Sequence, residues 1–134
     1  MDSIFTRIIN RDIPGYIVAE DDQSIAFLDI SPLVMGHVLV VPKQEVDYIF
    51  DLDDTTFTNL QLFSKKVAKA IKSVVECERI GIAVIGLEVP HAHIHLVPLN
   101  TMDDINFSRP KLDPSSDELA AMADTIRTAF KSGN

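Results

Sequence analysis

The clearest alternation of hydrophobic and polar positions lies at residues 90–99, which read Pro-His-Ala-His-Ile-His-Leu-Val-Pro-Leu. A period of two is typical of a β-strand, in which successive side chains point to opposite faces. We therefore expect His91, His93 and His95 on one face of a strand, and the apolar residues between them in the core. The two prolines suit the ends of such a strand.

Three other segments repeat their apolar residues every three or four positions, which is the spacing of an amphipathic helix. They are a short segment at residues 2–10, a long one at 53–75 and a last one at 115–131. The last segment begins with Ser-Ser-Asp-Glu, which has the form of a capping box. We predict one helix for each segment.

Four further segments have the character of strands, at residues 16–20, 24–30, 36–43 and 80–85. The segment at 36–43 is hydrophobic on both faces, so we expect it in the centre of a sheet. The segment at 80–85 should pair with the histidine strand. Together these elements predict an α+β fold, with an antiparallel sheet of about five strands and helices on one side.

Composition limits the function classes. A chain of 134 residues is expected to form a single domain, residues 1–134. The net charge of −8 argues against a nucleic-acid partner, because a phosphate backbone attracts a basic face. We find no membrane-span or signal-peptide pattern, and Cys77 alone cannot form an internal disulfide; both observations favour a cytoplasmic protein.

Three imidazoles on one face can serve either a metal or a phosphate. Alternate residues of a strand lie roughly 6.5 Å apart, whereas zinc holds each nitrogen at about 2 Å, so one ion cannot bind all three. A zinc site would need two of them together with His37 or a carboxylate. A phosphate-bearing substrate fits the row better, and a neutral imidazole is a nucleophile at pH 7. The spacing favours metal-free phosphoryl or nucleotidyl transfer, with zinc as the alternative.

The motif His-x-His-x-His followed by two apolar residues resembles the signature of the histidine triad family, which contains nucleotide-binding hydrolases and transferases. Two further stretches resemble family motifs in the same order: residues 29–32, Asp-Ile-Ser-Pro, and residues 36–43, which carry Gly-His, a hydrophobic strand and Pro-Lys. The resemblance covers residues 3–98. It implies a HIT-like fold, usually in a homodimer, with the helix at 115–131 outside the motif-bearing part.

The resemblance also implies a mechanism. His93 would attack the α-phosphorus of a purine nucleoside phosphoramidate or a similar AMP derivative, and water would hydrolyse the resulting nucleotidyl-histidine. His95 would donate to the phosphate oxygens, while His91 and His37 would orient the row and move protons. This scheme needs no metal and no other cofactor.

The resemblance further implies how the nucleoside is held. Asp29 would bind the ribose hydroxyls, since a carboxylate can accept two hydrogen bonds from a vicinal diol. The apolar residues expected near the nucleotide are Ile4, Phe5, Ile8, Phe27 and Ile30. For Asp29 the alternative is a cap for the turn before Pro32, and for the apolar residues it is simple core packing.

The chain departs from the family pattern in two places. Ser3 and Thr6 stand where many members carry a zinc-binding Cys-x-x-Cys, so we expect no structural zinc. Ile85 stands where others have Asn, and the Gln-Ser or Gln-Thr pair before the triad is missing; main-chain N–H groups near Gly86 or Glu88 are candidate replacements. The leaving group is therefore undefined. A nucleotide-binding module with little catalysis, a dinucleoside polyphosphate hydrolase and a zinc protein remain alternatives.

Overall fold

The computed structural model describes residues 2–133. Its elements in chain order are helix α1 (Ile4–Ile9), strands β1 (Ile17–Glu20), β2 (Ser24–Leu28) and β3 (Val38–Pro42), the 3-10 turn η1 (Ile49–Asp51), helix α2 (Asp54–Val74), strands β4 (Arg79–Ala83) and β5 (Ile94–Leu99), the 3-10 turn η2 (Met102–Ile105) and helix α3 (Ser116–Ser132). The predicted α+β fold with three helices and five strands is confirmed.

The five strands form one antiparallel sheet in the order β1-β2-β3-β5-β4. All five residues of β3 are buried, and β3 is the middle strand, as its apolar sequence predicts. The predicted pairing of β4 with the histidine strand is also confirmed, with Gly81 opposite Val97.

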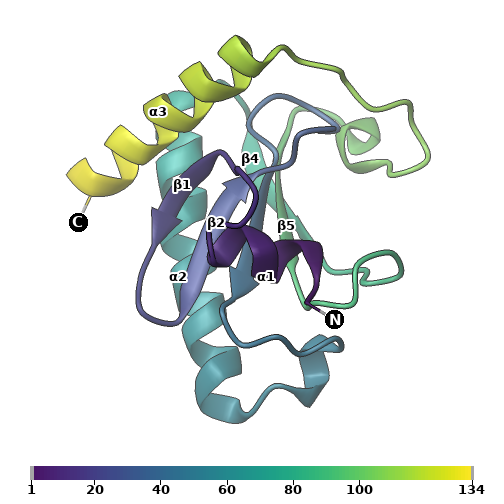
Figure 1. Ribbon diagram of the computed structural model, residues 1–134. Coiled ribbons are helices and arrows are strands. Elements are labelled where there is room, and N and C mark those ends of the chain that lie inside the picture. The colour runs from purple at the N-terminus through teal and green to yellow at the C-terminus, as the bar shows by residue number, and fades with distance from the viewer. Residues whose placement is uncertain (1, 134) are drawn as a thin grey trace.

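Helices cover both faces of the sheet, which corrects the prediction of helices on one side. Helices α2 and α3 contribute to the larger core cluster on one face, whereas Phe5 and Ile8 of α1 pack on the other against apolar residues of β2 and β3. Figure 1 shows α1 and α2 on opposite sides of these strands. The physical reason is that β2 and β3 are apolar on both faces, so each face needs a cover.

The histidine strand is shorter than predicted. Strand β5 begins at Ile94, so His91 and His93 lie in the loop before it. The Ala92 N–H donates at 2.7 Å to the carbonyl of Val46, which lies in the loop after β3. At Ala92 the main chain is therefore bonded to a loop and not to a strand of the sheet. The apolar residues between the histidines are nevertheless buried in the core cluster under α2, as the alternation predicts.

Helix α3 closes one edge of the sheet. It begins with the predicted capping box and packs against β1 and α2, and the Arg127 guanidinium donates to the Ile17 carbonyl of β1 at 2.7 Å. The opposite edge is β4, whose outer side pairs with no strand among residues 2–133. Within the same residues, no helix has both the length and the apolar character that a membrane span requires.

Candidate active site

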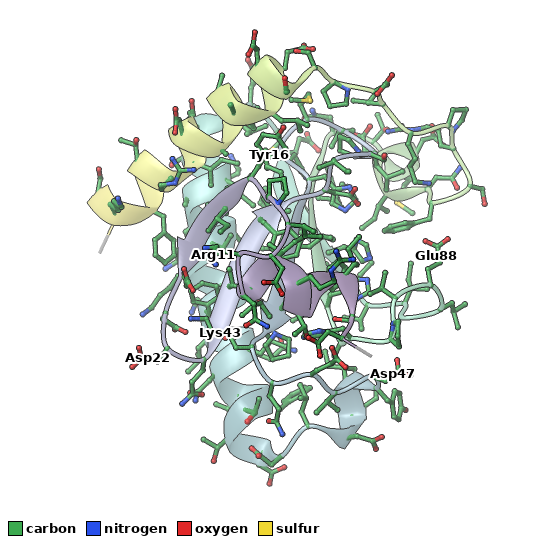
Figure 2. All side chains as sticks on the ribbon, in the orientation of Figure 1. Arg11, Tyr16, Asp22, Lys43, Asp47 and Glu88 are labelled. Atoms are coloured by element: carbon green, nitrogen blue, oxygen red, sulfur yellow. The ribbon has the colours of Figure 1, made fainter. Side chains whose placement is uncertain are left out.

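A cavity of about 410 Å³ lies beside the triad, between α1, the loop at residues 85–89 and the segment after η2. Its wall consists of Ile4, Phe5, Asp29, Leu39, Ile85, Gly86, Leu87, Glu88, Val89, His93, His95, Phe107 and Lys111. Figure 2 shows the Glu88 side chain projecting from its loop toward the segment after η2. The fold thus brings His93, His95 and Asp29 to one cavity.

Hydrogen bonding determines the protonation of His93. Its Nδ1 lies 2.7 Å from the main-chain carbonyl oxygen of His91. A carbonyl only accepts, so Nδ1 carries a proton, and in the neutral ring Nε2 keeps its lone pair. Nε2 makes no hydrogen bond within residues 2–133, and no buried side-chain nitrogen there lacks a partner, so Nε2 is accessible on a side chain that lines the cavity. His93 presents the unprotonated nitrogen that a nucleophile requires.

A second chain of hydrogen bonds determines the protonation of His95. The Leu33 N–H donates to Nδ1 of His37 at 3.1 Å, so neutral His37 carries its proton on Nε2. That proton is donated to Nδ1 of His95 at 2.9 Å, which leaves the proton of His95 on Nε2. The ring centres of His95 and His93 lie 5.0 Å apart, so an N–H donor lies beside the His93 ring.

Burial keeps these histidines neutral. Burial, and after it the nearby charges of His95 and Lys111, lowers the pKa of His37 to about 3. Burial, and after it the nearby charges of His93 and Lys111, lowers the pKa of His95 to about 4. At neutral pH neither ring carries a positive charge, which agrees with the hydrogen-bonding pattern.

His91 lies deepest, with no exposed surface. Its Nε2–H donates to the Pro42 carbonyl at 2.8 Å, and its Nδ1 accepts from the Ser3 hydroxyl at 2.7 Å. Both ring nitrogens are therefore occupied, and the ring is not part of the cavity wall. This differs from the expected role in moving protons, because the N-terminus of α1 covers the ring. What His91 offers the site is the carbonyl that orients His93.

Glu45 completes a network around His91 that sequence reasoning missed. The Ser3 N–H and the Thr6 hydroxyl both donate to Oε1 of Glu45, each at 2.6 Å. These bonds, with that from Thr6 the largest cause, lower the pKa of Glu45 to about 2. Ser3 also caps α1. The two hydroxyls expected in place of zinc ligands thus bind a carboxylate and an imidazole, and hydroxyls are not among the usual ligands of zinc.

One cluster deserves a test as a metal site. A ligand atom from each of Asp29, His37 and His95 lies within 4.8 Å of the other two. A metal at Nε2 of His37 would displace the proton from that atom to Nδ1, which already accepts the Leu33 N–H. The donor set therefore does not fit a metal without breaking a buried main-chain hydrogen bond.

Asp29 caps the turn before Pro32 and also lies on the cavity wall. Its Oδ1 accepts the Ser31 N–H at 2.9 Å, which caps the turn, and its Oδ2 lies 3.8 Å from Nε2 of His37, beside the triad. Burial raises the pKa of the Asp29 carboxyl. The side chain lies on the cavity wall and can meet a ligand.

The apolar residues expected near the nucleotide divide into two groups. Ile4 and Phe5 lie on the cavity wall. The other three do not: Phe27 packs behind Phe5 with ring centres 5.4 Å apart, Ile8 is buried in the core under α1, and Ile30 is 62% exposed to solvent. None of these three lies on the cavity wall: Ile8 and Phe27 belong to the buried cluster between α1 and the sheet, and Ile30 follows the end of β2.

Sequence reasoning also missed the wall supplied by the segment after η2. The Phe107 ring packs edge-on against His95, with ring centres 4.8 Å apart, and Lys111 adds an ammonium group to the wall. The segment has no periodic pattern, and no signal in the sequence could have brought it to the triad.

The comparisons with known proteins agree with this geometry. Residues 10–102 match the model of the HIT domain family. An adenosine 5′-monophosphoramidase of Schizosaccharomyces pombe is 32% identical over 134 residues, covering 98% of this chain and 100% of the relative. A HIT-like protein of Bartonella henselae has a crystal structure with a TM-score of 0.83, 30% identity and 96% coverage of each chain. A zinc-bound histidine triad family protein of Mycobacterium smegmatis gives a TM-score of 0.84, with 25% identity and coverage of 98% of this chain and 95% of that one.

Proposed function

This chain belongs to the HIT domain family, and on that premise we propose that it hydrolyses a purine nucleoside phosphoramidate, or a similar AMP derivative, through a nucleotidyl-histidine at His93. The observation that carries the proposal is the pair of opposite protonation states in one cavity. His93 offers a lone pair and its neighbour His95 offers an N–H. The name of the S. pombe relative supports a phosphoramidate as the substrate class.

The first step forms a bond between Nε2 of His93 and the α-phosphorus. The bond from phosphorus to the leaving nitrogen breaks, and the leaving amine takes a proton from solvent. Positive charge develops on the His93 ring in this step, and the hydrogen bond from Nδ1 to the His91 carbonyl stabilises it. Water then attacks phosphorus and loses a proton to solvent, the bond from phosphorus to Nε2 breaks, and AMP is released with His93 regenerated. Covalent catalysis thus replaces one difficult displacement by two easier ones.

His95 stabilises the negative charge that develops on the phosphate oxygens. Its Nε2–H can donate to a non-bridging oxygen, and the bond from His37 keeps that proton in place. The scheme requires no metal. A polyphosphate leaving group is less suited to the cavity, because Asp29 and Glu88 both add carboxylates to its wall.

The test is hydrolysis of adenosine 5′-phosphoramidate by purified protein in the presence of a chelator. We expect release of AMP at the same rate with and without the chelator. If the wild type binds AMP but hydrolyses neither the phosphoramidate nor a diadenosine polyphosphate, the binding module replaces this proposal. If the protein holds stoichiometric zinc and loses activity on chelation, the zinc alternative replaces it.

We propose that Asp29 binds the ribose. Asp29→Asn should weaken AMP binding by roughly 1–3 kcal/mol, the range for a hydrogen bond to a charged group, and the fold should persist. Calorimetry with AMP and 2′-deoxy-AMP measures the effect. The control is Asp22→Asn in the β1–β2 turn, far from the cavity wall (Figure 2). Equal binding of the two nucleotides by the wild type would remove the ribose role.

We also propose that the chain forms a homodimer through the β4 edge. The side chains of Ile82, Val84 and Ile85 are 41–61% exposed there, and Leu87 in the next loop is 88% exposed. An open strand edge with apolar side chains is suited to a second copy. Ile82→Lys should convert the dimer to a monomer in sedimentation analysis, whereas Met102→Lys, at an exposed apolar residue of η2, should not. A monomeric wild type would contradict the proposal.

A further inference from the structure

A phosphate group bound at His93 would bring negative charge into a cavity that offers little to balance it. The lowered pKa values of His37 and His95 leave both rings neutral at neutral pH. Asp29 and Glu88 add negative charge to the wall, and the protein as a whole has a net charge of −8. A phosphate ligand therefore needs a local cation.

Lys111 is the one lysine or arginine on this cavity wall among residues 2–133. Its charge already acts on the groups around the triad, because it lowers the pKa of His37 and of His95 and opposes the raised pKa of Asp29. The ammonium shares the cavity wall with His93, His95 and Asp29.

The ammonium is held in place. Nζ donates to the Phe107 carbonyl at 2.7 Å and lies 5.9 Å from the centre of the Phe107 ring. That ring in turn packs against His95. Nζ also lies 3.5 Å from the Arg109 carbonyl oxygen. An ammonium has three N–H donors, so one remains for a ligand.

The segment that carries Lys111 is fixed to the loop that carries Asp29 and His37. The Arg109 guanidinium donates to the Leu33 carbonyl at 2.6 Å, and the Leu112 N–H donates to the Pro32 carbonyl at 2.9 Å. These two bonds lie on either side of Lys111 in the sequence. The position of the ammonium is therefore determined relative to the cavity and is not that of a free surface lysine.

From this placement we infer that Lys111, which lies outside the residues matched by the HIT domain model, is the cation that binds the phosphate group of the nucleotide. The inference rests on the proposed function. The one ammonium on the wall can pair with a single phosphate group, whereas the two carboxylates would repel the further phosphates of a polyphosphate chain. Lys111 thereby selects nucleoside monophosphate derivatives.

The test compares two ligands that differ only in the phosphate, AMP and adenosine, by calorimetry on the full chain. Lys111→Met should weaken AMP binding about 10- to 100-fold, the effect of one charge-assisted hydrogen bond, and leave adenosine binding unchanged. Lys111→Arg should retain most of the AMP affinity. The difference between wild type and Lys111→Met should shrink at high salt, because Lys111 is exposed at the cavity rim.

The matched control is Lys69→Met, which removes an exposed lysine of α2 far from this cavity wall and should change neither affinity. Equal AMP affinities of the wild type and Lys111→Met would overturn the inference while leaving the proposed function intact. A parallel loss of AMP and adenosine binding would also overturn it, because the phosphate would then not be the group recognised. If the wild type binds neither ligand, the proposed function fails first and the role of Lys111 with it.

Discussion

Replacing His93 by glycine should reduce hydrolysis of adenosine 5′-phosphoramidate on the order of 10⁴-fold or more, the scale seen when a catalytic unit loses its nucleophile. No other imidazole of the site can take its place. Both ring nitrogens of His91 are engaged in hydrogen bonds, and the free nitrogen of His95 carries a proton. AMP binding should persist, because Asp29 and the apolar wall remain. Steady-state kinetics and calorimetry on the same preparation measure the two effects.

A covalent intermediate gives the sharper measurement for the same residue. Wild type mixed with substrate and quenched in base should carry one nucleotide, since a phosphorus–nitrogen bond to imidazole survives alkali. Peptide mapping should place the nucleotide on His93, and the His93→Gly variant should carry none. An adduct on another residue, or turnover by His93→Gly at the wild-type rate, would end the covalent mechanism.

His95→Ala should slow hydrolysis about 10²- to 10³-fold, the usual effect of losing one donor to a developing oxyanion. His37 acts through His95, so it is a positioning residue. His37→Ala should slow hydrolysis as well, whereas His37→Gln should retain more activity, because an amide N–H can still donate to Nδ1 of His95. Equal activities of the two His37 variants would show that this hydrogen bond does not set the protonation of His95.

Nuclear magnetic resonance gives the readout that a purely structural role would not change. In the wild type, the ¹⁵N shifts of His95 should show the proton on Nε2, and its pKa should be about 4. The pKa of the unfolded His95 ring is near 6.5. Between about pH 4 and pH 6.5 the unfolded ring therefore binds a proton, whereas the folded ring stays neutral. Stability therefore falls as the pH is lowered from about 6.5 toward 4, by roughly 1.4 kcal/mol per pH unit for this histidine at most. A pKa of His95 near 6.5 would contradict the neutral donor.

The architecture follows from local patterns of the sequence. Apolar side chains on both faces of residues 36–43 place β3 in the centre, and repeats of three and four produce α2 and α3 with their buried stripes. The alternation around the triad correctly places the intervening apolar residues in the core cluster under α2, while His91 and His93, which are also buried, contact Phe5 of α1. Such patterns suffice because burial of apolar surface acts on each segment through its own periodicity.

The chemistry of the site was decided by the tertiary structure. The bond that occupies His91 joins residues 88 positions apart, and the bond that sets His95 joins residues 58 apart. The side of the sheet taken by α1, the carboxylate of Glu45 and the position of Lys111 likewise depend on segments distant in sequence. A residue type offers several protonation states and partners, and only the neighbours that the fold brings within hydrogen-bonding distance select among them. The sequence by itself therefore identified the histidines, and the packing around them determines which ring nitrogen carries a proton and which keeps its lone pair.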